Sequence, residues 1–430
     1  MKESTSKTSR EAKKSSETGR WRNRVLIIAV AAVLAACGGA STIGKSTNAV
    51  SNGEGESGNL DLRAVIAVPG NPLTAYDISW VDQATQRYYL ADRSNAGLDI
   101  YNARNNTFIA RVPGFVGADP RGNDFSGPNG VLVIHSQNQA WVGDGPGPAM
   151  NSSVKVVDLA TNHIIATIQT NGTRRSDEMA YDPTDHLLAV VNNADDPPFL
   201  TLISTQVPYH VVRRVTFDAA LGAPFGVTSF SNGVEQPVWN PRTHRFYVSI
   251  PELNGVAEEG AIAVIDPRNG HLTQLFRVNN CAPGGLALGP DQQLLIGCTD
   301  PSRTVVIEAE DGEIVRQILG VGGSDEVWFN PGDDRYYLAA RNNPSGPVLG
   351  VIDAESNELV TRVTTAYNAH SVAVNQHNNH IFVPLTPPRN GHPTDPNRCV
   401  DLGGPSFTGH GCIGVYWSTD DQGEDDHSEE

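Results

Sequence analysis

Polar side chains that can bind ions recur at the starts of short apolar segments along this chain. In order, the segment starts carry Asp77, Asn129, Glu178, Glu235, Gly284, Glu326 and His370. Carboxylates that converge on one point repel each other unless a cation or a shared proton lies among them. Oxygen donors suit Ca²⁺, and a histidine also admits Zn²⁺ or Mn²⁺. If the fold brings the segment starts together, this set could bind one divalent cation or another small ligand.

Two members of this set also have acid–base chemistry. A histidine can accept a proton near pH 7, so His370 is a candidate general base, and Glu326 is the second candidate catalytic residue. The alternative role of the whole set is structural, because polar groups in wet channels commonly cap strands and hold water.

A second polar group follows other apolar segments and consists of Arg93, Asn193, Arg341 and Asn342. A guanidinium fork can orient an anionic or sugar-like ligand. Arginine and asparagine are also ordinary loop residues that satisfy backbone groups, and this alternative stays open.

The segments that carry these residues repeat from residue 62 to residue 418. The period is roughly 40 to 57 residues, which is typical of propellers and solenoids. Each repeat contains short alternating or β-branched runs separated by Asn, Asp, Gly and Pro, as strands and turns do. Second strands are predicted at 86–91, 139–142, 186–191, 245–250, 293–297, 335–340 and 380–384, and third strands at 98–102, 154–158, 200–204, 261–266, 304–308, 348–353 and 412–417.

The outer strands predict how the repeat array closes. Six of them follow third strands, at 108–112, 164–168, 211–217, 273–278, 314–319 and 359–363, and the seventh precedes the first repeat at 62–68. A blade completed from the other chain end closes a ring and removes its open edges. We therefore predict an all-β fold: a single seven-bladed β-propeller of four-stranded antiparallel blades, closed by an N-terminal outer strand that joins the last blade. In such a ring, both polar groups open on one face around the central channel.

Short motifs within the repeats resemble two families of seven-bladed propellers. The Val-Val-Asp and Val-Ile-Asp endings at 156–158, 264–266 and 351–353 resemble YVTN-type surface-layer repeats. Pro128-Asn-Gly-Val-Leu, Asp177-Glu-Met-Ala-Tyr-Asp and Glu235-Gln-Pro-Val-Trp-Asn-Pro resemble inner-strand motifs of the regucalcin/gluconolactonase family. The second resemblance implies a divalent metal in the channel that polarises a lactone carbonyl and activates water. It makes Asp77, Asn129, Glu178 and Glu235 the predicted ligands of this metal, or of another small ligand in the channel. The family's glutamate normally lies in the first blade, where this chain has Asp77.

The first 36 residues predict export. Eight Lys or Arg and three Glu in residues 1–24 precede an apolar run at 25–36, which is too short to cross a bilayer but suits a signal peptide. Leu34-Ala-Ala-Cys37 resembles the bacterial lipobox, which implies that lipid on Cys37 anchors the protein to the periplasmic face of a membrane or to the cell surface. An uncleaved signal anchor is the alternative. The predicted parts are a signal peptide at 1–36, a flexible linker at 37–61, the propeller at 62–418 and an acidic disordered tail at 419–430.

Charge and motifs exclude several classes of function. The chain has 48 acidic and 31 basic residues, a net charge of -17, which disfavours nucleic-acid binding because phosphates need positive potential. A GxxxxGK[ST] match at 39–46 lacks the flanking strand and helix of a phosphate loop, so no nucleotide is expected. Patterns for c-type haem, zincins and α/β-hydrolases do not occur. We expect a monomer.

Four cysteines follow Cys37, and an even number outside the cytoplasm indicates two disulfides. Of the three possible connectivities, we predict Cys281–Cys298, within the fifth blade, and Cys399–Cys412. The second bridge would staple loop 385–411, whose two predicted roles are a lid over the channel and a surface feature without a function of its own.

Two functions from different classes follow from these residues. The first is a lipid-anchored propeller that binds a small molecule or a protein at the polar end of its channel. The second is a metal-dependent hydrolase, lactonase- or esterase-like, and a lyase that uses His370 is a third. Because the sequence offers neither a clean metal-ligand set nor an obvious nucleophile, it favours the binding function.

Overall fold

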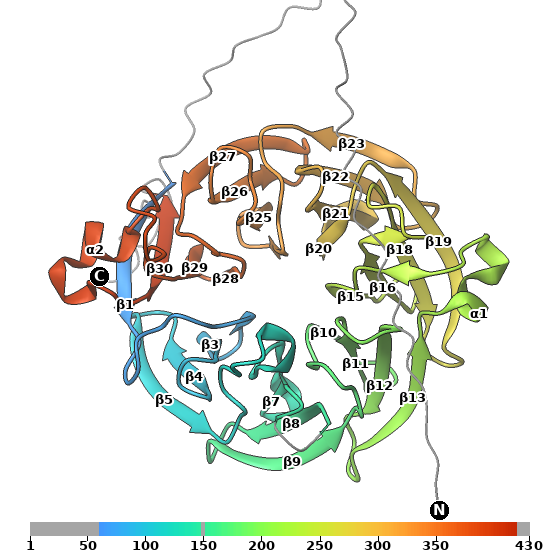
Figure 1. The fold of residues 1–430 in the computed structure, drawn as a ribbon, viewed down its shortest axis with the longest axis horizontal. Helices are drawn as coiled ribbons and strands as arrows, with labels where there is room; N and C mark the ends of the chain where they lie inside the picture. Colours follow the sequence, from blue (N-terminus) through green and yellow to red (C-terminus); the bar gives the residue numbers. More distant parts are fainter. Residues whose placement is uncertain (1–59, 148–150, 419–430) are drawn as a thin grey trace, which may run out of the picture. The chain divides into compact units, whose positions relative to one another are not determined.

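The computed structural model describes residues 60–147 and 151–418. The predicted signal peptide, the lipidation site Cys37 and the acidic tail lie outside these residues. In the described part, seven four-stranded antiparallel sheets surround a central axis as the blades of a propeller (Figure 1). The predicted fold class is therefore confirmed.

The first three blades follow the chain from the inner to the outer strand. Blade 1 contains β2 (Ser79–Asp82), β3 (Arg87–Asp92), β4 (Gly97–Asn102) and β5 (Thr107–Pro113). Blade 2 contains β6 (Val131–Ile134), β7 (Gln139–Asp144), β8 (Ser153–Asp158) and β9 (His163–Gln169). Blade 3 contains β10 (Met179–Asp182), β11 (Leu187–Asn192), β12 (Phe199–Ser204) and β13 (His210–Thr216).

The next three blades have the same order. Blade 4 contains β15 (Pro237–Asn240), β16 (Arg245–Ile250), β18 (Glu259–Asp266) and β19 (His271–Asn279). Blade 5 contains β20 (Pro283–Leu288), β21 (Gln293–Cys298), β22 (Arg303–Glu308) and β23 (Ile314–Ile318). Blade 6 contains β24 (Glu326–Asn330), β25 (Arg335–Ala340), β26 (Val348–Asp353) and β27 (Glu358–Thr364).

Blade 7 joins the two ends of the described chain. Its strands are β28 (Ala373–Asn375), β29 (His380–Leu385), β30 (Cys412–Ser418) and β1 (Leu60–Ala67). Strand β1 pairs antiparallel with β30, with Leu60 opposite Ser418 and Ala67 opposite Cys412. The predicted closure is present, and β1 begins at Leu60 rather than at residue 62.

Turn chemistry explains why the strands end where they do. Asn106, Asn162 and Asn357 lie just before the outer strands of blades 1, 2 and 6, with φ of 59°, 57° and 55°. Asparagine and glycine tolerate this left-handed conformation better than other residues, and Gly270 and Gly312 take the same place in blades 4 and 5. The Asn and Gly residues between apolar runs are therefore the signals that separate third from fourth strands.

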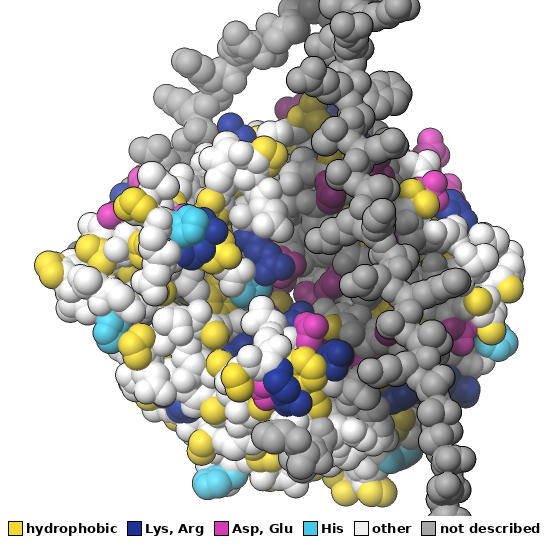
Figure 2. Space-filling view, in the orientation of Figure 1, with side chains coloured by type: hydrophobic (Ala, Val, Ile, Leu, Met, Phe, Trp, Pro, Cys, Tyr) yellow, Lys and Arg dark blue, Asp and Glu magenta, His cyan; other side chains and the backbone are white. Residues whose placement is uncertain are grey.

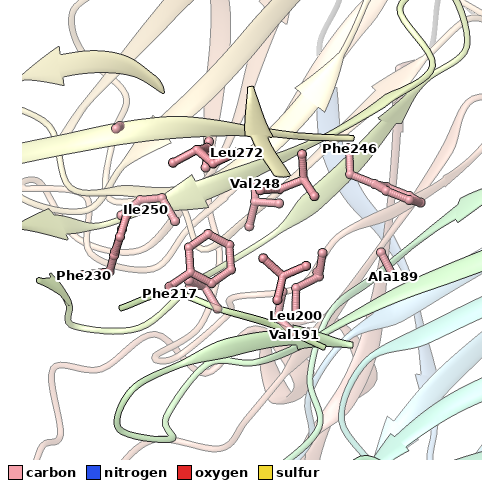
Figure 3. Packing of buried hydrophobic residues seen from close by; sticks show 14 of the residues in the cluster. Ala189, Val191, Leu200, Phe217, Phe230, Phe246, Val248, Ile250 and Leu272 are labelled. Carbon is pink, nitrogen blue, oxygen red and sulfur yellow. The ribbon is translucent and has the colours of Figure 1, made fainter. Parts of the chain in front are cut away.

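The hydrophobic core lies between neighbouring blades. All six residues of β11 are buried, whereas the outer strand β13 is mostly exposed. Figure 3 shows side chains of blade 3, such as Leu200, facing Phe246 and Val248 of blade 4, with Phe217 and Phe230 packed beside them. The second strand of each blade buries both of its faces in this way, so it has a nearly continuous apolar run rather than an alternating one.

Short helices and one extra pair of strands lie between the strands of the blades, and the sequence patterns did not predict them. Between blades 3 and 4 lie α1 (Ala219–Gly222), the 3₁₀ turn η3 (Ala223–Phe225) and the two-stranded pair of β14 (Phe230–Ser231) with β17 (Glu252–Leu253). The remaining short helices are η1 (Asn123–Phe125), η2 (His135–Gln137), η4 (Pro290–Gln292), α2 (Arg398–Gly403) and η5 (Pro405–Phe407). No helix among the described residues has the length and apolar character needed to cross a membrane.

Both predicted disulfides, Cys281–Cys298 and Cys399–Cys412, are present. Of the two predicted roles of loop 385–411, the contacts of α2 favour a surface feature over a lid. Its helix α2 lies beside β1 at the outer edge of blade 7 (Figure 1), and Phe407 packs into the same core as Val65. The loop therefore covers the rim of blade 7 because its apolar residues bury there.

Candidate ligand-binding site

A polar pocket of about 160 Å³ opens at the end of the channel where the inner strands begin. Its lining comes from the starts of inner strands and from the exits of β3 and β25, so the predicted face of the disc is the one that carries polar chemistry. We call this site the mouth pocket. Figure 2 shows acidic, basic and histidine side chains around the central hollow. The charged or ionisable lining residues are Tyr76, Asp77, Arg93, Arg175, Asp177, Glu178, Glu235, Asp325, Arg341 and His370.

Backbone hydrogen bonds define equivalent positions at five strand starts. The N–H groups of Asp77, Asn129, Asp177, Glu235 and Asp325 each donate to a carbonyl of the second strand, at 3.0, 2.9, 2.8, 2.9 and 3.3 Å. Thus Asp177 and Asp325 hold the position that the sequence repeat assigned to Glu178 and Glu326. The two glutamates lie one residue farther along their strands.

Three aspartates of this ring each bind an arginine. The ion pairs are Asp77–Arg93, Asp177–Arg175 and Asp325–Arg341. Arg341 lies 2.8 Å from Asp325, and the Nε of Arg175 lies 2.6 Å from Asp177. The arginine follows its aspartate by 16 residues in both blade 1 and blade 6. The same pair therefore repeats at two places in the ring, and the arginines already neutralise much of the charge that led us to expect a cation.

Asp77 is engaged through both carboxylate oxygens. Oδ2 accepts from Arg93, and Oδ1 lies 3.2 Å from Nε2 of His370. The other ring nitrogen, Nδ1, lies 2.7 Å from the carbonyl oxygen of Asn368 and must donate to it. Tyr76 stacks on the imidazole at 4.6 Å with an angle of 9° between the planes. Although burial alone would raise the pKa of Asp77, Arg93 and His370 hold it below its usual value.

The side chain of Asn129 likewise has hydrogen-bond partners for both its oxygen and its amide group. Its Oδ1 accepts from Nε of Arg93 at 3.0 Å, and its amide group donates to the carbonyl oxygens of Ser126 and Ser176 at 3.0 Å. The next residue, Gly130, approaches the backbone of blade 3 so closely that a Cβ would lie 2.0 Å from the carbonyl oxygen of Asp177. The Pro-Asn-Gly sequence therefore has a structural role in joining blades 1, 2 and 3.

The glutamates differ from the aspartates because no arginine pairs with them among the described residues. Glu326 accepts the N–H of Val372 at 3.0 Å, and Glu235 has only a long contact of 3.4 Å from the amide of Asn193. Glu178 is 7% exposed, and its Oε2 has no hydrogen-bond partner within the described part of the chain. Burying a carboxyl oxygen without a partner is costly, so Glu178 is the group that a ligand would satisfy.

Burial and neighbouring charges shift the protonation of these glutamates. Burial, followed by the carboxylates of Glu235 and Asp177, raises the pKa of Glu178 well above its usual value. Burial, followed by Asp325 and Asp177, raises the pKa of Glu235 to about 8. Burial also raises the pKa of Glu326. At neutral pH the pocket thus holds carboxyl protons that a bound cation would displace.

The structure separates the predicted site residues into three groups. The first group lines the mouth pocket and consists of Asp77, Glu178, Glu235, Arg93, Arg341 and His370. The second group lies beside the pocket: Asn129 is hydrogen-bonded to Arg93, and Glu326 is hydrogen-bonded to Val372. The third group, Asn193 and Asn342, lies farther out. No cluster of three or more His, Cys, Asp or Glu arranged to hold a metal occurs in residues 60–147 and 151–418.

Sequence reasoning missed Arg175, Asp325 and Tyr76. Two signals were available for Asp325: the acidic pair with Glu326 repeats the Asp177–Glu178 pair, and Asp325 stands 16 residues before Arg341 as Asp77 stands before Arg93. Arg175 had no such signal, since it precedes its strand start instead of following a second strand.

A second hollow of about 580 Å³ adjoins the mouth pocket and shares Arg175 and Glu235 with it. We call it the interblade groove because its walls are loops of blades 3 and 4. Its acidic members besides Glu235 are Asp124, Asp195 and Asp196. Asp195 accepts the N–H and hydroxyl of Thr173 at 2.8 and 2.7 Å, whereas Asp196 is exposed.

The opposite end of the channel is apolar. A cavity of about 550 Å³ there is lined by inner-strand residues that include Trp80, Trp239 and Trp328, with Trp80 and Trp328 edge to face at 5.1 Å. The largely apolar lining of this cavity contrasts with the polar lining of the mouth pocket and the interblade groove.

Comparison with known proteins supports the fold. No family model and no curated protein matches this chain. A chain in the crystal structure of a mitotic checkpoint complex is similar, with a TM-score of 0.56 and 12% identity over 75% of this chain and 90% of that one. A chain of hydrazine synthase from Kuenenia stuttgartiensis is similar with a TM-score of 0.56 and 13% identity over 73% and 92%. At these identities the likeness concerns the propeller architecture alone.

Proposed function

We propose that this protein is an extracytoplasmic, lipid-anchored propeller that binds a small polar ligand in the mouth pocket. The observation that supports this most directly is Glu178, which is buried in the lining with an unpartnered carboxyl oxygen. Around it, the Asp–Arg pairs fix a rigid polar frame, because paired and hydrogen-bonded charges hold their side chains in place. A frame of this kind with one unsatisfied group is typical of a binding site.

The test is a binding screen on the full chain, purified from an oxidising compartment so that both disulfides form. Compounds of positive, neutral and negative charge are compared by calorimetry against the wild type and Glu178→Gln. We expect at least one class to bind the wild type with a stoichiometry of one and to lose affinity in the variant. Binding that Glu178→Gln leaves unchanged contradicts the proposal.

A metal-dependent lactonase is the second candidate, supported by the carboxyl groups of Glu178 and Glu235, which line the same pocket. The donor set fits it poorly, because Arg93 already occupies oxygens of both Asp77 and Asn129. The full chain is therefore stripped of metal and titrated with Ca²⁺, Zn²⁺ and Mn²⁺. Stoichiometric binding lost in Glu178→Gln and Glu235→Gln supports this function and calls for a lactone and ester screen, whereas absence of binding rules out the metal-dependent mechanism.

The compartment is part of the proposal. The two disulfides support export, because such bonds form and persist in oxidising environments. A protein or a small molecule outside the cytoplasm would reach the mouth pocket directly in this arrangement.

A further inference from the structure

Among the described Asp, Glu, Arg and His residues that line the mouth pocket, those without an ion-pair partner carry carboxyl groups. Five carboxyl groups line it, at Asp77, Asp177, Glu178, Glu235 and Asp325, against three arginines, at Arg93, Arg175 and Arg341. Each arginine forms an ion pair with one of the three aspartates, so Glu178 and Glu235 are the two lining carboxyl groups without an arginine partner. An anionic ligand would therefore meet no free guanidinium and would face two additional carboxyl groups.

Carboxyl groups also outnumber basic residues in the described lining of the interblade groove. Arg175 is the only basic residue in the described lining of the groove, and it is bonded to Asp177. Asp124 lies 3.6 Å from Arg175 and is half exposed, and Asp196 has no ion-pair partner among the described residues. A ligand that runs from Glu178 past Glu235 into the groove thus meets carboxyl groups at both ends.

We propose that the ligand is a linear organic diamine or polyamine, with one ammonium group between Glu178 and Glu235 and a second near Asp124 and Asp196. This inference rests on the proposed function and names its ligand class. An ammonium group brings three N–H donors, which suits the unpartnered oxygen of Glu178. The chain's net charge of -17 would also concentrate cations at its surface.

The dimensions favour a slender ligand over a metal ion or a folded partner. The mouth pocket of about 160 Å³ exceeds the needs of a bare ion, and the groove adds a second hollow of about 580 Å³ that joins it at Glu235. Since Arg175 and Glu235 line both hollows, one flexible chain that passes these two residues would occupy both.

Ammonium binding also releases protons from the pocket. A cation beside Glu178 and Glu235 favours the ionised carboxylates, which lowers their pKa values from the raised ones. Binding heats measured near pH 7 in buffers of different ionisation enthalpy therefore differ by the number of protons released. A ligand bound only through neutral hydrogen bonds does not produce this difference.

The experiment titrates the full chain with α,ω-diamines of four to eight carbons. A monoamine, a diol and a dicarboxylate of matched length serve as probes of charge, and Ca²⁺ and a lysine-containing tripeptide serve as probes of source. We expect a best diamine length, proton release, and a loss of affinity of at least about tenfold in Glu178→Gln and in Glu235→Gln, as for a lost hydrogen bond between charged groups. Glu358→Gln, an exposed carboxyl on the outer strand β27, is the matched control and leaves affinity unchanged.

Asp196→Asn is the variant that tests the second ammonium group without touching the core. It should weaken the diamine severalfold and leave the monoamine unchanged. Equal effects on both, or tighter binding of Ca²⁺ or of the peptide than of every diamine, overturns the diamine proposal. If only the diol or the dicarboxylate binds, and does so through Glu178, the diamine proposal fails while the proposed function stands. If no probe binds, both fail.

Discussion

Replacing Glu235 by Gln should flatten the pH dependence of stability. Burial, with Asp325 and Asp177 facing it, raises the pKa of this carboxyl from 4.5 to about 8, while Arg175 and Asn193 oppose the rise. The folded protein therefore keeps a proton that the unfolded chain has lost, so the stability of the ligand-free wild type falls as pH rises between these two values. One such group contributes a slope of up to about 1.4 kcal/mol per pH unit.

Between pH 6 and pH 7.5 the wild type should then lose about 2 kcal/mol more than Glu235→Gln, which does not titrate. Urea denaturation of the ligand-free full chain, followed by tryptophan fluorescence with the disulfides intact, measures the difference at each pH. Glu358→Gln, which removes an exposed carboxyl, should follow the wild type. Parallel curves for the wild type and Glu235→Gln over this interval refute the assignment of a displaceable proton to the mouth pocket.

Three further predictions concern the frame of the site and its location. Arg93→Ala should lower the free energy of unfolding by about 3–5 kcal/mol in denaturation experiments, because it leaves the buried carboxylate of Asp77 unpaired. Arg316→Ala removes one partner of an exposed ion pair and should lower it by less than about 1 kcal/mol. Equal losses in the two variants would contradict a structural role for the buried pair. Replacing Cys281 and Cys298 together by Ser should cost about 3 kcal/mol, measured in the same way, because the bridge spans 17 residues. Cys37→Ser should abolish metabolic labelling with a fatty acid and release the protein from membranes, and a protein that stays membrane-bound but unlabelled indicates a signal anchor.

The fold could be predicted because each blade carries its own local signals. Asparagine and glycine in left-handed turns divide the apolar runs, and an excess outer strand at the front of the chain requires closure at β30. The insertions gave no such signal. Helix α2 lies against β1 because Phe407, which follows the helix, packs in the same apolar cluster as Val65. These two residues are more than 300 positions apart in sequence, so local sequence patterns do not predict the contact.

The candidate site could be predicted only in part, for a specific physical reason. The repeat places a polar residue at each strand start, but two adjacent acids compete for that place in blades 3 and 6. The backbone hydrogen bonds assign it to Asp177 and Asp325, and sequence spacing alone cannot decide between neighbours one residue apart. The sequence also gives no partner for Arg175, whose pair with Asp177 depends on how the strand start turns into the channel.

Carboxylates that converge in a propeller channel can be neutralised by a bound metal or by arginine side chains. Which of the two is present determines which ligands the channel can bind. Arg93 donates to both Asp77 and Asn129, so it takes two of the oxygens that a lactonase-type metal would need. Arg341 repeats the arrangement with Asp325 in blade 6. Although burial opposes it, Arg93 and His370 hold the pKa of Asp77 below its usual value, so the Asp77–Arg93 pair stays charged near neutral pH. Burial raises the pKa values of Glu178 and Glu235 as well, so recognition at the mouth pocket should depend on whether a ligand can replace the protons of these two carboxyl groups.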